Sequence, residues 1–433
     1  MKVLFLNTYE SGGGAAIATT RLMEALRKIG VDARLLVLYS DNIPKAYVDE
    51  LTSSRVMGLI AKARFISERG LIYYANGRDR SRMFKVSTAS MGFNILHHPW
   101  VINADVIHIN WINQGFLSLN GIKALLELKK LVFWTMHDMW PATGICHLPY
   151  YLSPKGDIKS CSRYTEECGY CPFLKSSKPR DLSYTGLMRK RFLGNGDIQF
   201  IAVSNWLKEQ VRISANLKRC NIEVVHNPID TKAFRPIPAS EETDWLTPES
   251  IPIVMSAARL DDPIKGPSLC VKTINRLCHI EPSLINYGRL VLIGNIKDKR
   301  VFSDIKMPVY CLGHVDDEVS LASIYSVARV TISTSLCETF GQTLTESLAC
   351  GCPVVAFDFG GQTDIIKPGI NGYLTPAYDT RAMAINILKA IELSDNPQGR
   401  SQCKESVQKF NATAIAEKMK QLYLSKLNKG SDL

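Results

Sequence analysis

The chain has 433 residues, of which 46% are hydrophobic and 21% charged. This composition is that of a globular protein, and it excludes fibrous and disordered classes. No run approaches the ~20 apolar residues of a membrane-spanning helix, and the first residues predict a strand instead of a signal peptide. At about 150 residues per domain, the length predicts two or three domains, each with its own core.

The net charge is +11, and residues 1–230 carry all of this excess, since they hold 30 basic and 19 acidic residues. Such an uneven distribution predicts an anionic partner for the first half of the chain. A phospholipid surface, a diphosphate-bearing substrate and nucleic acid all fit. The alternative is a basic protein whose charge has no partner.

Short apolar runs alternate with helical patterns through the first half of the chain. The predicted strands are residues 2–8, 34–38, 104–110, 131–137, 199–204 and 223–227. An amphipathic helix is predicted over residues 15–29, after the first strand. The strands are apolar throughout instead of alternating, which is typical of a parallel sheet covered on both faces. Residues 1–230 are therefore predicted to form one α/β domain.

A stretch rich in proline, glutamate and serine, residues 231–250, predicts an interdomain linker. Strands then recur at residues 253–257, 289–294, 309–312, 330–334 and 353–357, with helices at 266–278, 318–328 and 343–349. We therefore predict a second doubly wound α/β domain over residues 251–400 and a cleft between the two domains. From residue 401 to 433 we predict a helix that crosses back to the first domain.

Three glycines, Gly12, Gly13 and Gly14, lie between the first strand and the first helix. Glycine lets the backbone approach a ligand closely, and a helix N-terminus offers free N–H groups to a phosphate. The spacing matches neither the dinucleotide motif nor the P-loop. A phosphate site and a plain tight turn are both open on this signal alone.

Two cations follow the first strand of the second domain: Arg259 comes shortly after it, and Lys265 precedes the next helix. An arginine fork and a lysine point charge at the end of one strand would bind a diphosphate. The alternative is a pair of solvated surface cations.

Two glutamates, Glu338 and Glu346, are separated by eight residues in a block that contains Phe340-Gly341-Gln342. The first belongs to a loop and the second to a predicted helix, so both can line one cleft. A carboxylate accepts hydrogen bonds from two neighbouring hydroxyls. This pair therefore predicts a site for a ribose and a sugar ring.

These motifs together carry a resemblance that covers nearly the whole chain. Arg259 with Lys265-Gly266, the block 338–346, the glycine-rich first loop and His226-Asn227-Pro228-Ile229-Asp230 resemble the retaining glycosyltransferases of family 4, which share the GT-B fold. Residues 104–172 are similar to a narrower bacterial subgroup associated with capsule, exopolysaccharide and O-antigen (lipopolysaccharide) assembly. The fold that the resemblance implies is α/β, with two Rossmann-like domains facing across a cleft.

The resemblance implies the transfer of a hexose, with retention of configuration, from a UDP- or GDP-sugar to a glycan or polyprenyl-diphosphate-linked acceptor. It implies no cofactor or metal for catalysis, and a cytoplasmic enzyme at the inner face of the membrane. Because the family does not use the paired carboxylates of glycosidases, we name no nucleophile.

The resemblance also assigns roles to residues. Arg259 and Lys265 would bind the diphosphate, and Glu346 would bind the ribose. Glu338, with the backbone of Phe340, Gly341 and Gln342, would hold the transferred sugar.

In the first domain, Gly13 and Gly14 would let that domain close over the diphosphate. His137 matches a family histidine near the sugar, and Asp138 would orient it. The alternative for His137 is a core histidine.

Four cysteines, Cys146, Cys161, Cys168 and Cys171, lie in a polar, turn-rich insertion at residues 144–172. The last two have the spacing of a metal knuckle, and four thiolates suit a structural zinc. His147 could replace one thiol. Reduced packing cysteines and disulfides are the alternatives.

Three clusters of basic residues account for part of the charge. They are Arg55, Lys62, Arg64 and Arg69 on a helical run, then Arg78, Arg80, Arg82 and Lys85, and then Arg189-Lys190-Arg191. Apolar residues between the first four, among them Val56, Leu59, Ile60 and Phe65, predict an interfacial helix on an anionic membrane. A solvated helix face is the alternative.

Functions of other classes are also open. One is a nucleotide-sugar epimerase of the same fold. A dehydrogenase is disfavoured because the dinucleotide motif is missing. A basic, zinc-containing nucleic-acid-binding protein would leave Glu338 and Glu346 unexplained, so we expect no nucleic-acid partner.

Overall fold

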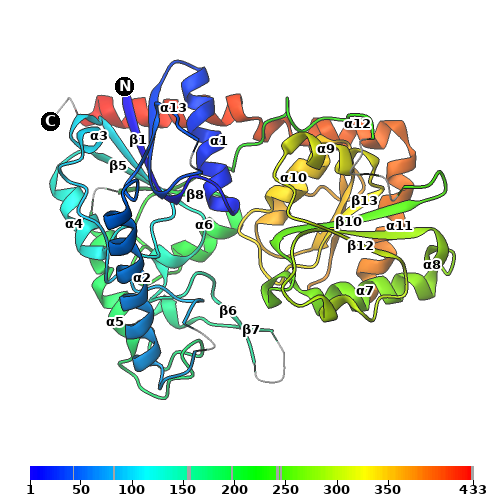
Figure 1. Ribbon diagram of the computed structural model, residues 1–433, viewed down its shortest axis with the longest axis horizontal. Helices are drawn as coiled ribbons and strands as arrows, with labels where there is room; N and C mark the ends of the chain where they lie inside the picture. Colours follow the sequence, from blue (N-terminus) through cyan, green and yellow to red (C-terminus); the bar gives the residue numbers. More distant parts are fainter. Residues whose placement is uncertain are drawn as a thin grey trace. The chain divides into compact units, whose positions relative to one another are not determined.

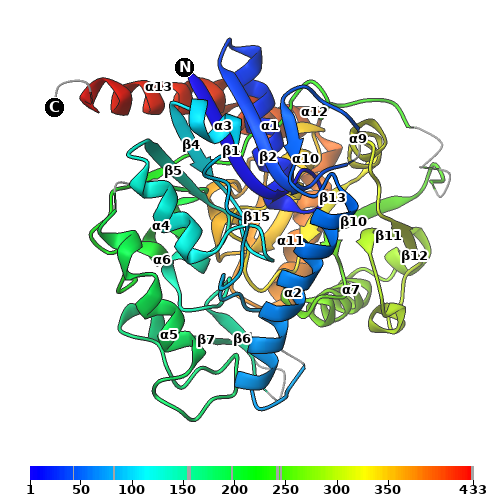
Figure 2. The same cartoon turned by 60° about the vertical axis from the view of Figure 1, so that its left-hand side comes forward.

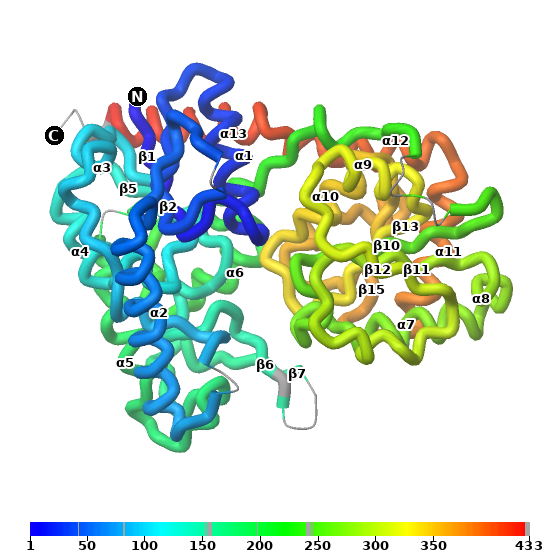
Figure 3. The backbone as a smooth tube through the Cα atoms, viewed as in Figure 1, coloured from blue at the N-terminus to red at the C-terminus, as the bar shows by residue number. Residues whose placement is uncertain are grey.

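The computed structural model describes residues 1–41, 43–80, 83–153, 158–196, 198–239, 243 and 246–430 (Figure 3). The chain divides into two compact units. Unit 1 comprises Met1–His226 with Thr413–Leu433, and unit 2 comprises Asn227–Ala412. Each unit has its own parallel sheet.

Unit 1 is built on a seven-stranded sheet of order β3-β2-β1-β4-β5-β8-β9. Its strands are β1 (Lys2–Tyr9), β2 (Asp32–Tyr39), β3 (Val48–Glu50), β4 (Val106–Ile109), β5 (Leu131–Met136), β8 (Ile198–Ala202) and β9 (Ile222–Val224). Every neighbouring pair is parallel. Residues 3–6 of β1 are at most 1% exposed, so this strand is covered on both faces. This confirms the predicted parallel α/β sheet.

The helices of unit 1 lie on both faces of this sheet (Figure 1). They are α1 (Gly14–Lys28), α2 (Arg55–Ala75), α3 (Pro99–Asn103), α4 (Leu119–Glu127), α5 (Leu182–Arg189), α6 (Asn205–Arg212) and α13 (Ala412–Gly430), with short 3-10 turns η1 (Trp140–Ala142), η2 (Arg163–Thr165) and η3 (Arg191–Gly194). The predicted first helix is confirmed as α1.

Helix α13 comes from the C-terminal end of the chain and packs on unit 1, beside α1 and β1 in both views of the ribbon (Figures 1 and 2). Lys420 Nζ donates to Ile29 O at 3.3 Å, and Lys418 Nζ donates to Val224 O at 2.8 Å. Tyr423 is fully buried against His108 and Phe133. A buried aromatic residue therefore holds the last helix to the first sheet.

Unit 2 has a six-stranded parallel sheet of order β12-β11-β10-β13-β14-β15. Its strands are β10 (Ile251–Arg259), β11 (Gly288–Asn295), β12 (Val309–Gly313), β13 (Val330–Ser333), β14 (Val354–Phe357) and β15 (Gly372–Thr375). Its helices are α7 (Pro267–Ile280), α8 (Leu284–Tyr287), α9 (Glu318–Val327), α10 (Gln342–Ala349), α11 (Thr380–Asp395) and α12 (Pro397–Ser406), with 3-10 turns η5 (Pro263–Lys265), η6 (Lys299–Phe302), η7 (Gly361–Asp364) and η8 (Gln408–Phe410). All of the predicted strands and helices of this part are present.

The main core of unit 2 fills one face of its sheet. Alternate strand residues such as Ile253, Met255 and Leu292 pack there against Ile274 of α7 and Ile387 of α11. Because successive side chains of a strand point to opposite faces of the sheet, burying these residues fixes the register of each strand and thereby the place where it ends.

Two boundaries differ from those predicted. The stretch 231–250, predicted as a linker, belongs to unit 2, although residues 240–242, 244 and 245 lie outside the described part. Phe234 is 1% exposed, and the backbone N–H of Ile237 donates to Ser326 Oγ at 3.1 Å, so the stretch packs on α9. Residues 401–412 also stay in unit 2, and only α13 joins unit 1.

The cysteine-rich insertion carries a short antiparallel pair, β6 (Tyr150–Leu152) and β7 (Ile158–Ser160). Residues 154–157 of this insertion lie outside the described part. A small core of Ile72, Val86, Ile145, Cys146, Cys171, Phe173 and Leu174 joins the insertion to α2. In Figure 2, the lower end of α2 lies beside the strand pair β6 and β7.

Candidate functional site

In each sheet, the strand order runs outward in one direction from a central strand and then continues from that strand in the other direction. The point between the two central strands where the order reverses is the switch point. In sheets of this class, ligands bind beyond the carboxyl ends of the strands at that point. The switch point lies between β1 and β4 in unit 1 and between β10 and β13 in unit 2. The loops after β1, β10 and β13 contain five of the predicted site residues: Gly13, Lys265, Glu338, Phe340 and Gly341.

Arg259 is the last residue of β10 in unit 2, so the strand extends two residues beyond its predicted end at residue 257. Its Nε donates to Asp261 Oδ1 at 3.0 Å, and its side chain is 47% exposed. Asp261 Oδ2 also accepts from the backbone N–H of Asp298 at 3.2 Å. Sequence reasoning missed Asp261, which orients the guanidinium while leaving part of it open to solvent.

Lys265 and Glu338 come together at the switch point of unit 2. Lys265 Nζ lies 2.5 Å from Glu338 Oε1, and the two side chains are 24% and 21% exposed. Thr334, directly after β13, donates its Oγ1 to Lys265 O at 2.9 Å. The ion pair therefore links the loop after β10 to the loop after β13.

Gly266 makes this approach feasible. Its φ is +65°, and a Cβ at this position would lie 2.0 Å from Thr334 O. Any side chain at residue 266 would push the two loops apart.

The loop of residues 338–341 packs against two further glycines that the sequence analysis did not single out. The backbone N–H of Gly361 donates to Glu338 O at 2.7 Å. A Cβ on Gly360 would lie 2.5 Å from Glu338 O, and one on Gly361 would lie 2.0 Å from Thr339 O. The repeated glycine after β14 was the available sequence signal.

Helix α10 starts at the end of this loop, where Gly341 has a φ of +109° and provides no side-chain cap. Its first residue, Gln342, carries a buried donor, Nε2, which has no hydrogen-bond partner in the described part of the chain. Phe340 is 2% exposed and packs edge-on against Phe410 at 5.4 Å. The packing of Phe340 holds the loop of residues 338–341 in place. The N-terminal backbone amides of α10 lie at the end of this loop.

Glu346 lies one turn further along α10 and is 5% exposed. A carboxylate this deeply buried is uncommon without a functional or structural role. Glu338 and Glu346 thus belong to a loop and to the helix that follows it, as predicted.

In unit 1, the glycine-rich loop connects β1 to α1. Gly12 and Gly13 have φ values of +81° and +112°, whereas Gly14 is the first helical residue. Gly13 is the N-cap of α1 and offers no side-chain acceptor to the first amides of the helix. The predicted helix N-terminus behind a flexible turn is therefore present.

His137 follows β5 directly, and its Nε2 lies 3.0 Å from Asn110 Oδ1. Burial lowers the pKa of His137 to about 4, although the Asp138 carboxylate opposes this shift. The imidazole is therefore neutral near pH 7, and Asn110 accepts the proton of Nε2.

Asp138 forms a network that sequence reasoning missed. Its Oδ2 accepts from His147 Nδ1 at 2.6 Å and from Trp111 Nε1 at 2.9 Å, and its Oδ1 accepts from Trp140 N at 2.8 Å. Burial raises its pKa, but the charge of His147 and these hydrogen bonds outweigh that and hold the pKa of Asp138 below its usual range. The nine-residue spacing of Asp138 and His147 gave no signal, because the turn η1 between them is irregular.

His147, the alternative to one of the cysteine ligands, hydrogen-bonds other side chains in the structure. Both ring nitrogens face other groups, Nδ1 towards Asp138 and Nε2 towards Ser87 Oγ at 3.1 Å.

The four cysteines of the insertion line one small cavity. Burial raises the pKa of all four thiols, to about 12 for Cys168 and about 11 for Cys171. All twelve cysteines of the chain are free thiols in the structure. As the side chains stand, no group of three or more His, Cys, Asp or Glu residues within the described ranges could hold a metal ion.

Two of the basic clusters differ from the prediction. Lys190 is fully buried, donates to Trp140 O and Thr143 O, and lies 3.7 Å from the centre of the Trp140 ring. Burial lowers its pKa to about 7. Lys190 therefore does not contribute to a basic surface.

The predicted basic helix exists as α2, but its basic face is smaller than expected. Arg69 is 4% exposed and pairs with Glu68 at 3.1 Å. Arg64 lies 4.0 Å above the ring of Phe93. Arg55 and Lys62 remain exposed, and Arg82 lies outside the described residues. The exposed part of α2 is largely apolar, with Val56 and Leu59 65% and 68% exposed.

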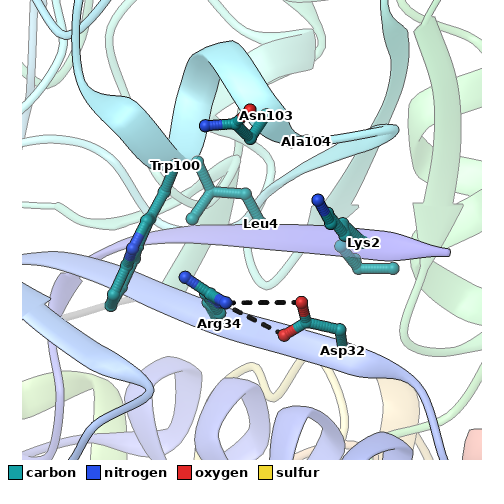
Figure 4. A pocket seen from close by; sticks show the side chains of 8 residues that line it. Lys2, Leu4, Asp32, Arg34, Trp100, Asn103 and Ala104 are labelled. Atoms are coloured by element: carbon teal, nitrogen blue, oxygen red, sulfur yellow. Dashed lines mark hydrogen bonds and ion pairs between the residues drawn. The ribbon is translucent and has the colours of Figure 1, made fainter.

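A separate pocket of about 250 Å³ lies in unit 1 at the amino-terminal ends of β1 and β2 (Figure 4). Asp32, Arg34 and Trp100 line it, with Arg34 Nε 3.2 Å from Asp32 Oδ1 and the guanidinium 5.2 Å from the Trp100 ring. This end of the sheet is opposite to the switch-point loops, and none of the predicted site residues lines the pocket.

Comparison with known proteins identifies the class. Among solved structures, sucrose-phosphate synthase from Thermosynechococcus elongatus superimposes with a TM-score of 0.66 at 21% identity, over 99% of this chain and 100% of that chain. Anabaena Alr3699/HepE in complex with UDP-glucose gives a TM-score of 0.62 at 17% identity, over 98% and 100%. At these identities the likeness shows the fold alone, which is the α/β GT-B architecture of two Rossmann-like units.

Family models identify the family within this fold. The model "Glycosyltransferase Family 4" matches residues 12–233, and "Glycosyl transferases group 1" matches residues 251–393. Since the first match covers more than half of the chain, the protein belongs to glycosyltransferase family 4. This confirms the family that the motifs indicated, and the epimerase and nucleic-acid-binding alternatives gain no support.

The curated relatives match only part of this chain. A D-inositol 3-phosphate glycosyltransferase of Acidothermus cellulolyticus is 31% identical over 169 residues, which are 36% of this chain and 38% of that protein. A phosphatidyl-myo-inositol mannosyltransferase of Mycobacterium leprae is 26% identical over 183 residues, 41% and 48% of the two chains. The chain thus spans less than half the length of these relatives. Among the helices that the structure describes, none is long and apolar enough to cross a membrane.

Proposed function

We propose that this protein is a retaining hexosyltransferase that uses a UDP- or GDP-sugar and a glycan or polyprenyl-diphosphate-linked acceptor in cell-surface polysaccharide biosynthesis. The observation that carries the proposal is the ion pair of Lys265 with Glu338 at the switch point of unit 2. It joins a cation suited to phosphate and a carboxylate suited to sugar hydroxyls in one place. Family membership supports the same reaction class.

Arg259 and Lys265 would bind the donor diphosphate. Each already forms an ion pair with a carboxylate, and Arg259 is half exposed. A diphosphate carries more charge than a single carboxylate and accepts bidentate hydrogen bonds from arginine. Positive groups fixed at the leaving phosphate stabilise the charge that develops as the glycosidic bond breaks.

Glu346 and Glu338 would bind the ribose and the transferred sugar. Releasing Lys265 to the diphosphate frees Glu338 Oε1 to accept from sugar hydroxyls. The unpartnered Nε2 of Gln342 provides a donor, and the uncapped amides of α10 provide more. The binding of UDP-glucose by the structurally similar Anabaena Alr3699/HepE favours UDP as the nucleotide.

Three residues of unit 1 also have roles in the proposed reaction. Gly13 and Gly14 would allow the backbone to approach the diphosphate at the N-terminus of α1. His137 is neutral near pH 7, so it would act near the sugar as a hydrogen-bonding group and not as a cation. Positioning and leaving-group electrostatics would carry the rate, with retention of configuration and without a metal.

The sugar-transfer proposal is tested by slow hydrolysis of the donor, with water as the acceptor. Purified protein is incubated with UDP-glucose, UDP-galactose, UDP-N-acetylglucosamine or GDP-mannose, and proton NMR records which anomer appears first. Retention predicts that the α-donor releases the α-sugar. Initial release of the β-sugar, or hydrolysis that is equal in wild type and in Lys265→Ala, would contradict the proposal.

We further propose that α2 places the enzyme peripherally on the anionic inner face of the cytoplasmic membrane. Six apolar side chains on this helix are 36–69% exposed: Val56, Leu59, Ile60, Ile66, Leu71 and Tyr74. Exposed apolar residues beside Arg55 and Lys62 are typical of helices that insert into an anionic interface.

Flotation with phosphatidylglycerol vesicles tests this placement, with phosphatidylcholine vesicles for comparison. The double variant Val56→Ser/Leu59→Ser should lose most of its vesicle binding. The matched control Val319→Ser changes an equally exposed residue of α9 (59% exposed) and should bind like wild type. Equal binding of the double variant and the control would exclude α2 as the membrane contact.

A further inference from the structure

We propose that Cys146, Cys161, Cys168 and Cys171 form a structural zinc site in unit 1, independent of the donor site. The four residues come from three separate stretches of the insertion, yet all of them line one cavity. The cavity holds about 10 Å³, which is the space of roughly a single water molecule. A bare metal ion fits this space, whereas an organic ligand does not.

Backbone hydrogen bonds hold the chain in tight turns around the cysteines. The N–H of Cys168 donates to Arg163 O at 2.9 Å, and those of Leu174 and Ser176 donate to Cys171 O at 3.1 and 3.0 Å. These turns lie where Cys161, Cys168 and Cys171 line the same cavity as Cys146.

Packing alone explains only half of the cluster. Cys146 and Cys171 are at most 8% exposed and belong to the small core with Ile72 and Phe173. Cys161 and Cys168 are half-buried and lie outside that core, yet they line the same cavity. Since the side chains as they stand do not form a metal site, binding requires the thiols to draw together, which Cys161 and Cys168 can do at the partly exposed side.

Four cysteine sulfurs select zinc among the common ions of a structural site. The metal would hold the segment around Cys146, whose neighbour His147 hydrogen-bonds Asp138. It would therefore fix the loop after β5, which begins with His137. It would also stabilise the insertion, whose described residues form one short strand pair and a 3-10 turn.

The test measures metal content and cobalt spectra of the full chain. Protein made in zinc-supplemented medium should contain about one zinc ion per chain. After zinc removal under reducing conditions, Co²⁺ should give the visible bands and the sulfur charge-transfer band of a tetrahedral thiolate site. The variant Cys161→Ser/Cys168→Ser should lose both signals.

The matched control is Cys220→Ser, which changes a half-buried cysteine of the same unit outside the cavity and should behave like wild type. If folded, reduced wild-type protein contains no zinc and gives no tetrahedral cobalt spectrum, the proposal is wrong, and the cysteines are packing residues. The same holds if Cys220→Ser loses the metal as fully as the double variant. Because these readouts use no nucleotide, they do not depend on the donor-site proposal.

Discussion

Tyr423 anchors the C-terminal helix to unit 1, and replacing it should destabilise that unit. Its Oη lies 2.5 Å from His108 Nδ1, and the other nitrogen of His108 lies 2.7 Å from Thr135 Oγ1. All of these groups are buried. Tyr423→Phe keeps the ring but leaves one imidazole nitrogen without its partner, at a cost of about 1–3 kcal/mol. Tyr423→Ala also removes the ring packed against Phe133, for a total of about 3–5 kcal/mol.

Urea unfolding followed by tryptophan fluorescence measures this loss. Five of the six tryptophans lie in residues 1–226, so the signal reports mainly on unit 1. They are Trp100, Trp111, Trp134, Trp140 and Trp206. The control Tyr74→Phe changes an exposed side chain and should leave the midpoint unchanged. If Tyr423→Ala unfolds at the same urea concentration as this control, the account of α13 as a part of unit 1 fails.

Two further predictions concern acid stability and glycine packing. Burial lowers the pKa of His108 to about 3 and of His137 to about 4. Between pH 6.5 and about 4 the unfolded chain therefore binds more protons than the folded chain. The free energy of unfolding should have its highest value above pH 6.5 and should fall by up to ~1.4 kcal/mol per pH unit for each histidine as the pH drops. Urea titrations at several pH values check this, and a flat profile would contradict the burial of both rings. Gly361→Ala places a Cβ 2.0 Å from Thr339 O, whereas Gly58→Ala on α2 meets open space. Calorimetry should show a lower melting temperature for Gly361→Ala, and for Gly58→Ala a free energy of unfolding that is higher by up to ~1 kcal/mol. The reverse order would refute the packing argument.

The sequence predicted the elements that bury long apolar runs, because periodicity reports burial directly. Every predicted strand is present, and so is every predicted helix except that of residues 401–433, whose described part is divided between α12, η8 and α13. Short elements such as β3 and β15 were missed, since three or four residues with a glycine or a charge among them carry no periodic signal. The end of the linker and the start of the crossing helix were misplaced because buried contacts such as that of Phe234 depend on the tertiary fold.

In the candidate site too, some residues could be predicted from the sequence and others could not. Arg259 and Lys265 were predicted from their positions after a strand, and Glu338 from its place in a loop eight residues before Glu346. The structure brings Lys265 and Glu338 together. Their partners Asp261, Gly360 and Gly361 were missed, as was the bond between Asp138 and His147, because these contacts depend on how irregular loops fold. Lys190 was placed on the surface because a run of three basic residues gives no indication that the middle one points inward.

The central claim is that the switch-point residues of unit 2 bind a nucleoside diphosphate, and calorimetric titration with UDP and GDP tests it most directly. Wild type should bind one of the two nucleotides. Lys265→Ala should weaken that binding by roughly 10- to 150-fold, the loss of a charged hydrogen bond of about 1.5–3 kcal/mol, and Glu346→Ala should weaken it similarly. The control Lys299→Ala alters a cation of the turn η6 in the same unit and should bind like wild type. If neither nucleotide binds, or if Lys265→Ala and Glu346→Ala bind as tightly as Lys299→Ala, the assignment of the donor site is wrong.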